Sequence, residues 1–336
     1  MVHAVPGTPE MLLPGGVERP IAHAAFEPLC FAEPELESSA FQWLLRTDND
    51  NPSLAYRRGS FLACDEEVVS YRLWRPKGPL RASVVLLHGA CDYSAAFDEL
   101  GPVLAAKGIA ALTYDQRGFG TRRSRGRSLE PAYQLSDVKI ACDTLRAKLS
   151  EFCGGDDGLA QPFILGESMG GGVAVRAAAA GLDIAGLVLV SPASLANFYR
   201  RFAFQIAANM VTFLIPWSHW YIERRVESEL SDAAAIRLLS DPLVLRRVPS
   251  RMIAQLLSLA AEAAQDAIRI RVPTLTLLGT DEKIVHRGCV NAMVDRFDGH
   301  KELAIVPGGT HFLIHERNNE RLFDLTANWI LKRAAR

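Results

Sequence analysis

The residues with the clearest chemical potential form the string Gly166-Glu167-Ser168-Met169-Gly170, a G-x-S-x-G pattern. The apolar run Phe163–Leu165 precedes it and the small-residue run Val173–Ala177 follows. Between a strand and a helix, this pattern predicts a sharp turn that holds the serine in a strained backbone conformation. An ordinary glycine-containing loop is the alternative. We expect Ser168 to present its hydroxyl above a sheet edge as a nucleophile.

A serine hydroxyl needs a neighbouring base, and the base works best when a carboxylate orients it. In chain order, Asp281 follows the apolar run Thr274–Leu278, and His311 follows Leu303–Val306. Taken singly, the aspartate could be a turn residue and the histidine a surface loop residue. Their order and their positions after strands predict a Ser168, Asp281, His311 triad. Glu282 is the second choice for the acid.

Two further histidines need an interpretation. His315, four residues after His311, is expected to point elsewhere, as a structural or solvated side chain. His88-Gly89 ends an earlier apolar run and could be a simple turn. Beside a nucleophile elbow, however, that loop is expected to supply an oxyanion donor, the N–H of Ala90, and the N–H of Met169 is expected to supply the other.

The elements that must position these residues alternate in type. Short apolar runs predict strands, and the stretches between several of them have helical patterns. The fold expected is therefore α/β, with a mainly parallel sheet flanked by helices. The predicted strands are Val68–Trp74, Ser83–Leu87, Ile109–Tyr114, Phe163–Leu165, Leu187–Val190, Thr274–Leu278 and Leu303–Val306.

The alternation fails at two places. Residues 1–65 are rich in proline and are expected to form an N-terminal arm. Residues 195–267 contain no strand candidate and are expected to form a helical cap inserted in the core, which comprises 66–194 and 268–336. Such a cap would lie over the strand ends where ligands bind. Three roles are open for its apolar residues: packing of the cap core, contact with a membrane, or lining of an acyl pocket. The candidates for the pocket lining are Phe198, Phe202, Phe213 and Trp217.

Composition excludes several other classes. A net charge of −1 gives no electrostatic reason to expect a nucleic-acid partner. The six cysteines are scattered without zinc-ligand spacing, which indicates reduced thiols and a cytoplasmic protein. The first twenty residues lack the apolar stretch of a signal peptide. The run of arginines from Arg117 to Arg127 is typical of a solvated loop, with contact to an anionic head group as the alternative.

Several motifs together resemble the α/β-hydrolases, and within them the monoacylglycerol lipase and lysophospholipase-like group (serine aminopeptidase S33, Hydrolase_4). The matching stretches are Leu87–Ala90, Tyr114–Gly120, Gly166–Gly171, Asp241–Leu243, Leu278–Val285 and Gly309–His311. The resemblance implies Ser168 as nucleophile, Asp281 and His311 as its partners, and Ala90 and Met169 as oxyanion donors. This sequence departs from the group at Glu167, where histidine is usual, and at His286.

The expected function is therefore hydrolysis of a carboxylic ester of a lipid-like or acyl substrate, with no metal or organic cofactor. The expected partner is a small ester or lipid, with peripheral membrane contact through the cap as a further possibility. One alternative is an amidase or aminopeptidase with the same triad, because the fold does not fix the leaving group. The other is a non-catalytic binding protein, which the intact triad argues against.

Overall fold

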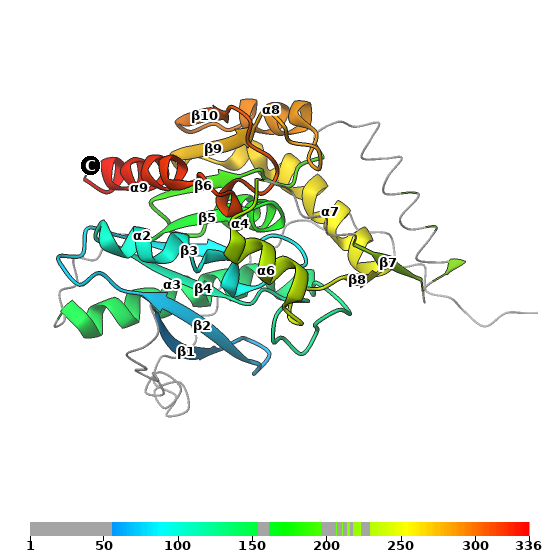
Figure 1. Ribbon diagram of the computed structural model, residues 1–336, viewed down its shortest axis with the longest axis horizontal. Coiled ribbons are helices and arrows are strands. Elements are labelled where there is room, and N and C mark those ends of the chain that lie inside the picture. Colours follow the sequence, from blue (N-terminus) through cyan, green and yellow to red (C-terminus); the bar gives the residue numbers. More distant parts are fainter. Residues whose placement is uncertain are drawn as a thin grey trace, which may run out of the picture. The chain divides into compact units, whose positions relative to one another are not determined.

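The computed structural model describes residues 56–153, 161–195, 206, 210, 214–215, 218–222 and 229–335. Eight strands form one sheet in the order β1-β2-β4-β3-β5-β6-β9-β10 (Figure 1). Strands β1 and β2 pair antiparallel, β2 is also antiparallel to β4, and the other neighbours are parallel. Their bounds are β1 Arg57–Leu62, β2 Val68–Trp74, β3 Ala82–Leu87, β4 Ile109–Tyr114, β5 Phe163–Glu167, β6 Gly186–Val190, β9 Thr274–Gly279 and β10 Lys301–Val306.

The central strands explain why the sequence predicted this architecture. Every residue of β3, β4, β5, β6 and β9 is buried. A strand covered on both faces has no polar alternation, so it is read from the sequence as a continuous apolar run. The mainly parallel α/β fold is therefore confirmed, and each predicted strand is present to within a few residues.

Helices cover both faces of the sheet (Figure 1). Side chains of α2 and α9 pack with strand residues in one large apolar cluster, while α3 and α4 lie on the other face. None of the described helices is long and apolar enough to cross a membrane. The helices are η1 Ser94–Phe97, α2 Leu100–Ala106, α3 Pro131–Cys153, α4 Met169–Ala179, α6 Asp232–Ser240, α7 Ser250–Asp266, η2 Ala267–Arg269, α8 Arg287–Asp295, η3 Leu313–His315 and α9 Glu320–Ala334.

The segment expected to be all-helical contains two short strands. Strand β7, His219–Tyr221, pairs antiparallel with β8, Arg247–Pro249. The prediction that residues 195–267 lack strands is therefore wrong. Strands of three residues leave no periodicity in the sequence, and these two form only by pairing with each other. Helices α6 and α7 make up most of the remaining described residues of this segment.

Strand β1 also differs from the expectation. It lies within the range given to the N-terminal arm, yet it pairs along its whole length with β2. Only residues 56–65 of that arm are described. The sequence gives no apolar run here, because the strand begins with Arg57, Arg58 and Gly59. An edge strand tolerates charged and small residues better than a central strand does.

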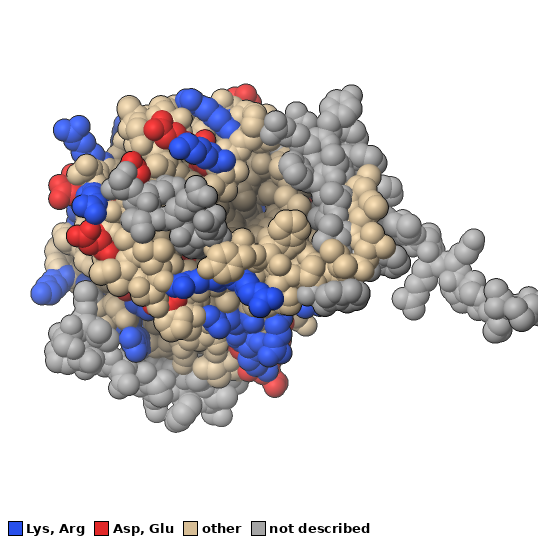
Figure 2. All heavy atoms as spheres, turned by 45° about the vertical axis from the view of Figure 1, so that its right-hand side comes forward, with Lys and Arg blue, Asp and Glu red and all other residues tan. Residues whose placement is uncertain are grey.

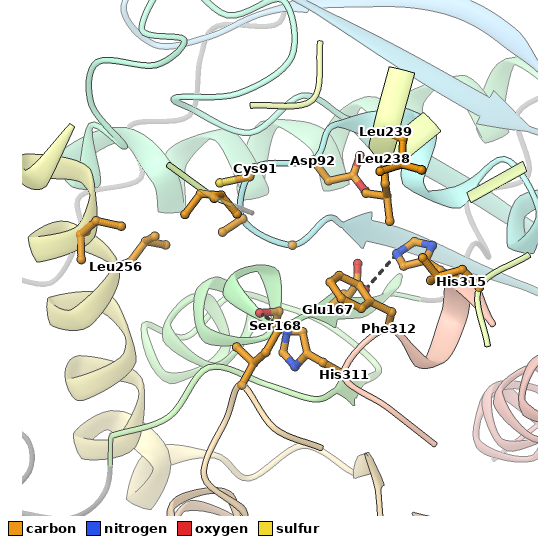
Figure 3. Close-up of a pocket in the computed structure, with 16 residues that line it drawn as sticks. Cys91, Asp92, Glu167, Ser168, Leu238, Leu239, Leu256, His311, Phe312 and His315 are labelled. Carbon is orange, nitrogen blue, oxygen red and sulfur yellow. Dashed lines mark hydrogen bonds and ion pairs between the residues drawn. The ribbon is translucent and has the colours of Figure 1, made fainter. Parts of the chain in front are cut away.

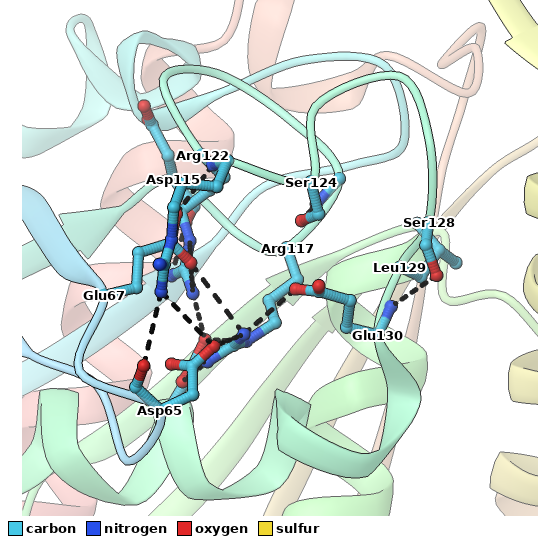
Figure 4. A network of polar contacts seen from close by, with 12 residues as sticks. Asp65, Glu67, Asp115, Arg117, Arg122, Ser124, Ser128, Leu129 and Glu130 are labelled. Atoms are coloured by element: carbon cyan, nitrogen blue, oxygen red, sulfur yellow. Dashed lines mark hydrogen bonds and ion pairs between the residues drawn. The ribbon is translucent and has the colours of Figure 1, made fainter.

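The loop after β4 is held by a buried ion-pair network (Figure 4). The guanidinium of Arg117 is fully buried and pairs with Asp65, Glu130 and Asp137 at 2.7, 2.9 and 2.9 Å. Asp65 and Glu130, with Glu67, form a group of carboxylates close enough to hold a cation, and Arg117 places its own positive charge among them. The hydrogen bond from Arg117 lowers the pKa of Asp65 to about 2.

Two further side chains complete this loop. Arg122 is buried and pairs with Glu67 at 2.9 Å and with Asp137 at 3.0 Å. Asp115 accepts hydrogen bonds from the backbone N–H groups of Ser94 and Thr121. The arginine run is therefore not uniformly solvated, because its first two members tie the β1–β2 turn and α3 to the loop that follows β4.

Candidate active site

The turn between β5 and α4 has the geometry of a nucleophile elbow. Ser168 has φ 49° and ψ −113°, a strained conformation for a residue with a side chain. A Cβ at Gly166 would lie 2.3 Å from the carbonyl oxygen of Gly170, and one at Gly170 would lie 2.1 Å from that of Leu87. Both flanking positions therefore need glycine because other backbone lies too close.

His311 joins the serine to a carboxylate. Its Nε2 lies 3.0 Å from Ser168 Oγ, and its Nδ1 lies 2.7 Å from Glu282 Oε2. A carboxylate only accepts, so Nδ1–H donates to Glu282 and Nε2 is left to accept the serine proton. Burial raises the pKa of Glu282, but the hydrogen bond and charge of His311, together with the N–H groups of Ile284 and Val285, outweigh it and the pKa falls below its ordinary value. The carboxylate is thus held ionised beside the imidazole.

The acid that contacts His311 is Glu282, and the prediction of Asp281 is corrected. Asp281 is exposed; its backbone N–H donates to Gly309 O, and its carboxylate accepts from the hydroxyl of Thr280. The turn after β9 points the next side chain inward, and the extra methylene of glutamate gives it the reach. The other oxygen of Glu282 accepts from the N–H groups of Ile284 and Val285 at 2.7 and 2.9 Å, which fixes the carboxylate.

The predicted oxyanion loop is braced by His88, which is completely buried. Its Nδ1 donates to Gly89 O at 2.8 Å, and its Nε2 accepts from the backbone N–H of Gln116 at 2.9 Å. The side-chain amide of Gln116 donates in turn to His88 O. Ala90 lines the same cavity as Ser168, and Met169 is the first residue of α4, where backbone N–H groups have no partner within the helix.

The cavity over Ser168 measures about 320 Å³ (Figure 3). Figure 3 shows Ser168 and His311 between Leu256 on one side and Glu167, His315 and Asp92 on the other. Much of the lining is apolar and comes from the cap, from α7 and from the loops after β9 and β10. These residues are Ile222, Leu230, Leu238, Leu239, Ile253, Leu256, Ile284 and Phe312.

Sequence reasoning did not find this lining. The pocket residues that it proposed, Phe198, Phe202, Phe213 and Trp217, lie outside the described residues. The signal that could have found part of the true lining is the amphipathic pattern of α7, where Ile253 and Leu256 lie three residues apart on one helical face.

The other end of the cavity is charged. Glu167 Oε1 lies 3.0 Å from His315 Nε2, and Arg237 lies 3.2 Å from His315 Nδ1 and 3.1 Å from Asp92 Oδ2. A guanidinium can only donate, so His315 Nδ1 accepts and Nε2–H donates to Glu167. These contacts assign His315 as the neutral Nε2–H tautomer, with an ionised carboxylate at each end of the chain.

Burial raises the pKa of Glu167, but its contacts with His315 outweigh this, so the pKa falls below its ordinary value. For Asp92, burial likewise raises the pKa, but the charge of Arg237 together with the other groups around it, among them the N–H of Tyr93, lowers the pKa below its ordinary value. The expectation that His315 points away is wrong. It is 1% exposed and lines the cavity, because the η3 turn brings it back toward the residue that precedes the nucleophile.

Comparisons with known proteins place this geometry in a family. The family model described as Hydrolase_4, serine aminopeptidase S33, matches residues 78–318, which include Ser168, Glu282 and His311. The chain belongs to the serine aminopeptidase S33 family. The resemblance inferred from the motifs is thereby confirmed.

Among relatives of this S33 protein, monoglyceride lipase of Mus musculus is 27% identical over 297 residues, covering 85% of this chain and 92% of that enzyme. Among solved structures, a soluble variant of monoglyceride lipase from Saccharomyces cerevisiae with a substrate analog superposes with a TM-score of 0.66 at 22% identity, covering 79% of this chain and 92% of the other. The Paleococcus ferrophilus monoacylglycerol lipase gives a TM-score of 0.62 at 21% identity, covering 79% and 99%. At these identities the structures support the α/β-hydrolase fold.

Proposed function

We propose that this S33 protein is a serine hydrolase that cleaves the carboxylic ester of a lipid with one acyl chain, of the monoacylglycerol or lysophospholipid type. The observation that carries the proposal is the Ser168–His311–Glu282 chain at the floor of a largely apolar cavity. The monoglyceride lipases among its relatives support the choice of substrate.

In the proposed reaction Ser168 Oγ attacks the ester carbonyl while His311 Nε2 takes its proton, and Glu282 stabilises the imidazolium that forms. The N–H groups of Ala90 and Met169 stabilise the oxyanion. His311 then gives the proton to the leaving alcohol, which departs and leaves an acyl group on Ser168. A water molecule activated by His311 hydrolyses this acyl-enzyme.

The two ends of the cavity suit the two parts of such a substrate. The apolar end beside Leu256 suits an acyl chain, because burying apolar surface is favourable. The end beside Glu167 and Asp92 suits an alcohol with hydrogen-bond donors, since both residues are ionised acceptors.

An acyl-length series tests the proposal. With p-nitrophenyl esters and with monoacylglycerols, kcat/KM should rise with acyl length until the cavity is full. Each added methylene contributes about 0.8 kcal/mol, or roughly fourfold. A profile that peaks at acetate and falls steadily would exclude the acyl-chain site and leave a small ester as substrate.

A second candidate is hydrolysis of an aminoacyl amide, as the description of the family suggests. The observation that favours it is the pair of ionised carboxylates, Glu167 and Asp92, which line the cavity and could accept a free α-ammonium group. Aminoacyl arylamides in the same substrate panel decide between the candidates. A higher kcat/KM for these amides than for every ester would replace the first proposal with the second.

Peripheral contact with a membrane through the cap is also part of the proposal. It is supported by Trp220 and Tyr221 on β7, whose side chains are 52% and 68% exposed, since such aromatic residues favour membrane interfaces. We also retain the proposed cytoplasmic location, with which the reduced thiols of Cys64, Cys142 and Cys289 are consistent.

A further inference from the structure

Six arginines of the loop after β4 and of the cap lie near one another. We call Arg123, Arg125, Arg127, Arg246, Arg247 and Arg251 the arginine face. The first three come from the loop after β4, the next two from the start of β8 and the turn before it, and the last from the first turn of α7. All are exposed except Arg125, which is partly buried.

Hydrogen bonds join the loop after β4 to the cap. Arg125 donates to the carbonyl oxygen of Pro242, and Arg251 donates to that of Arg127 at 2.8 Å. The loop after β4 is thus fastened to the cap at two points. These contacts bring the loop that carries Arg123, Arg125 and Arg127 beside the cap segment that carries the other three arginines.

Much of this charge is not neutralised within the described chain. The side chains of Arg127, Arg246 and Arg247 form no ion pair with a described residue, while Arg123 lies 3.8 Å from Asp65 and from Glu67 and is 67% exposed. The whole protein has a net charge of only −1. Figure 2 shows basic side chains gathered on this face, beside a hollow in the surface.

The arginine face adjoins the opening of the cavity. The backbone N–H of Ile222, a cavity residue, donates to the carbonyl oxygen of Arg246 at 2.8 Å. Arg247 pairs in register with the exposed Tyr221. Arg251 lies on the same helix as the cavity residues Ile253 and Leu256. Positive charge and exposed aromatic side chains thus lie next to the apolar lining.

We propose that the arginine face docks the protein on the surface of a membrane that contains anionic lipid, with Trp220 and Tyr221 entering the interface. An anionic bilayer presents many weak charges over a plane, which suits several exposed guanidinium groups spread over three segments. The exposed aromatic residues suit the boundary between head groups and acyl chains. The inference rests on the membrane contact of the proposed function and deepens it, because it assigns that contact to the arginine face and to anionic lipid.

Each arginine near such a surface strengthens binding about fivefold, so removal of three should weaken it on the order of 100-fold. The attraction acts over about one Debye length, which is about 8 Å at physiological salt and about 3 Å at 1 M. Binding should therefore be lost at about 1 M salt, whereas purely apolar docking would persist.

The test is co-sedimentation of the full chain with vesicles of phosphatidylcholine alone or mixed with phosphatidylglycerol. The variant Arg127→Gln/Arg246→Gln/Arg247→Gln removes the three guanidinium groups without ion pairs. The matched control is Arg81→Gln/Arg271→Gln/Lys332→Gln, which removes the same charge from exposed positions elsewhere. Arg81 and Arg271 precede β3 and β9 and so lie at the amino ends of the parallel strands, whereas the loop after β4 lies at their carboxyl ends.

We expect wild type and the control to bind the anionic vesicles and the arginine variant to lose that binding, with hydrolysis of a soluble ester unchanged in all three. Equal binding to both vesicle types, or an equal loss in the variant and its control, would overturn the proposal. A wild-type protein that binds anionic vesicles but hydrolyses no ester would overturn the proposed function and leave this inference intact.

Discussion

Glu282 Oε2 lies 2.7 Å from His311 Nδ1, whereas the adjacent Asp281 is exposed and its carboxylate accepts a hydrogen bond from the hydroxyl of Thr280. The direction of the turn after β9 thus decides which of two adjacent carboxylates faces the imidazole of His311. The hydrogen bond from the backbone N–H of Asp281 to the carbonyl oxygen of Gly309 holds this turn beside the loop that carries His311.

The first prediction separates these neighbouring acids. Glu282→Gln should lower kcat by roughly 10⁴-fold, the size of the loss when the orienting acid of a protease triad is replaced by its amide. Asp281→Asn should change kcat little, because that side chain does not contact His311. Steady-state kinetics on one soluble ester measure both. A large loss in Asp281→Asn and a small one in Glu282→Gln would instead identify Asp281 as the acid that orients His311.

The second prediction concerns the close approach at the elbow. Gly170→Ala should destabilise the protein by about 1–3 kcal/mol or more and abolish turnover, since the new Cβ would lie 2.1 Å from Leu87 O. Gly172→Ala is the matched control two residues further along α4, where the nearest atom would be 3.4 Å away. Urea unfolding measures the stability of the two variants, and equal stability would refute this geometry.

The sequence predicted those site residues whose positions depend on neighbouring residues in the chain, and it missed those whose positions depend on tertiary packing. Ser168 and His311 were identified because a strand, a glycine turn and the residue type coincide. The acid was not, because Asp281 and Glu282 are adjacent and the direction of the turn chooses between them. The cavity lining and the Glu167–His315 pair were missed because they depend on how distant segments pack. Strand β1 was missed because its residues are charged, as edge strands permit.

The third prediction follows from the pKa of Asp65, about 2 in the folded protein because Arg117 donates to it. An unpaired aspartate has a pKa of about 3.9. Because the folded pKa is the lower one, this carboxylate contributes stability above about pH 4 and loses it as the pH falls toward 2. The difference in free energy of unfolding between wild type and Asp65→Asn should shrink over that range.

A suitable control for this measurement is Asp298→Asn, because Asp298 pairs at 3.5 Å with an arginine that is 84% exposed. Its effect should be small at every pH, as for most surface ion pairs. If the stability difference for Asp65→Asn did not change with pH, the pairing of Asp65 with Arg117 would contribute nothing.

Whether Ser168 is the nucleophile is tested by labelling with a fluorophosphonate probe, which reacts with activated serines, followed by peptide mass spectrometry. We expect a single adduct on Ser168, lost together with ester turnover in Ser168→Ala while the circular dichroism spectrum, and hence the fold, is unchanged. An adduct on another serine, or turnover that survives in Ser168→Ala, would contradict it.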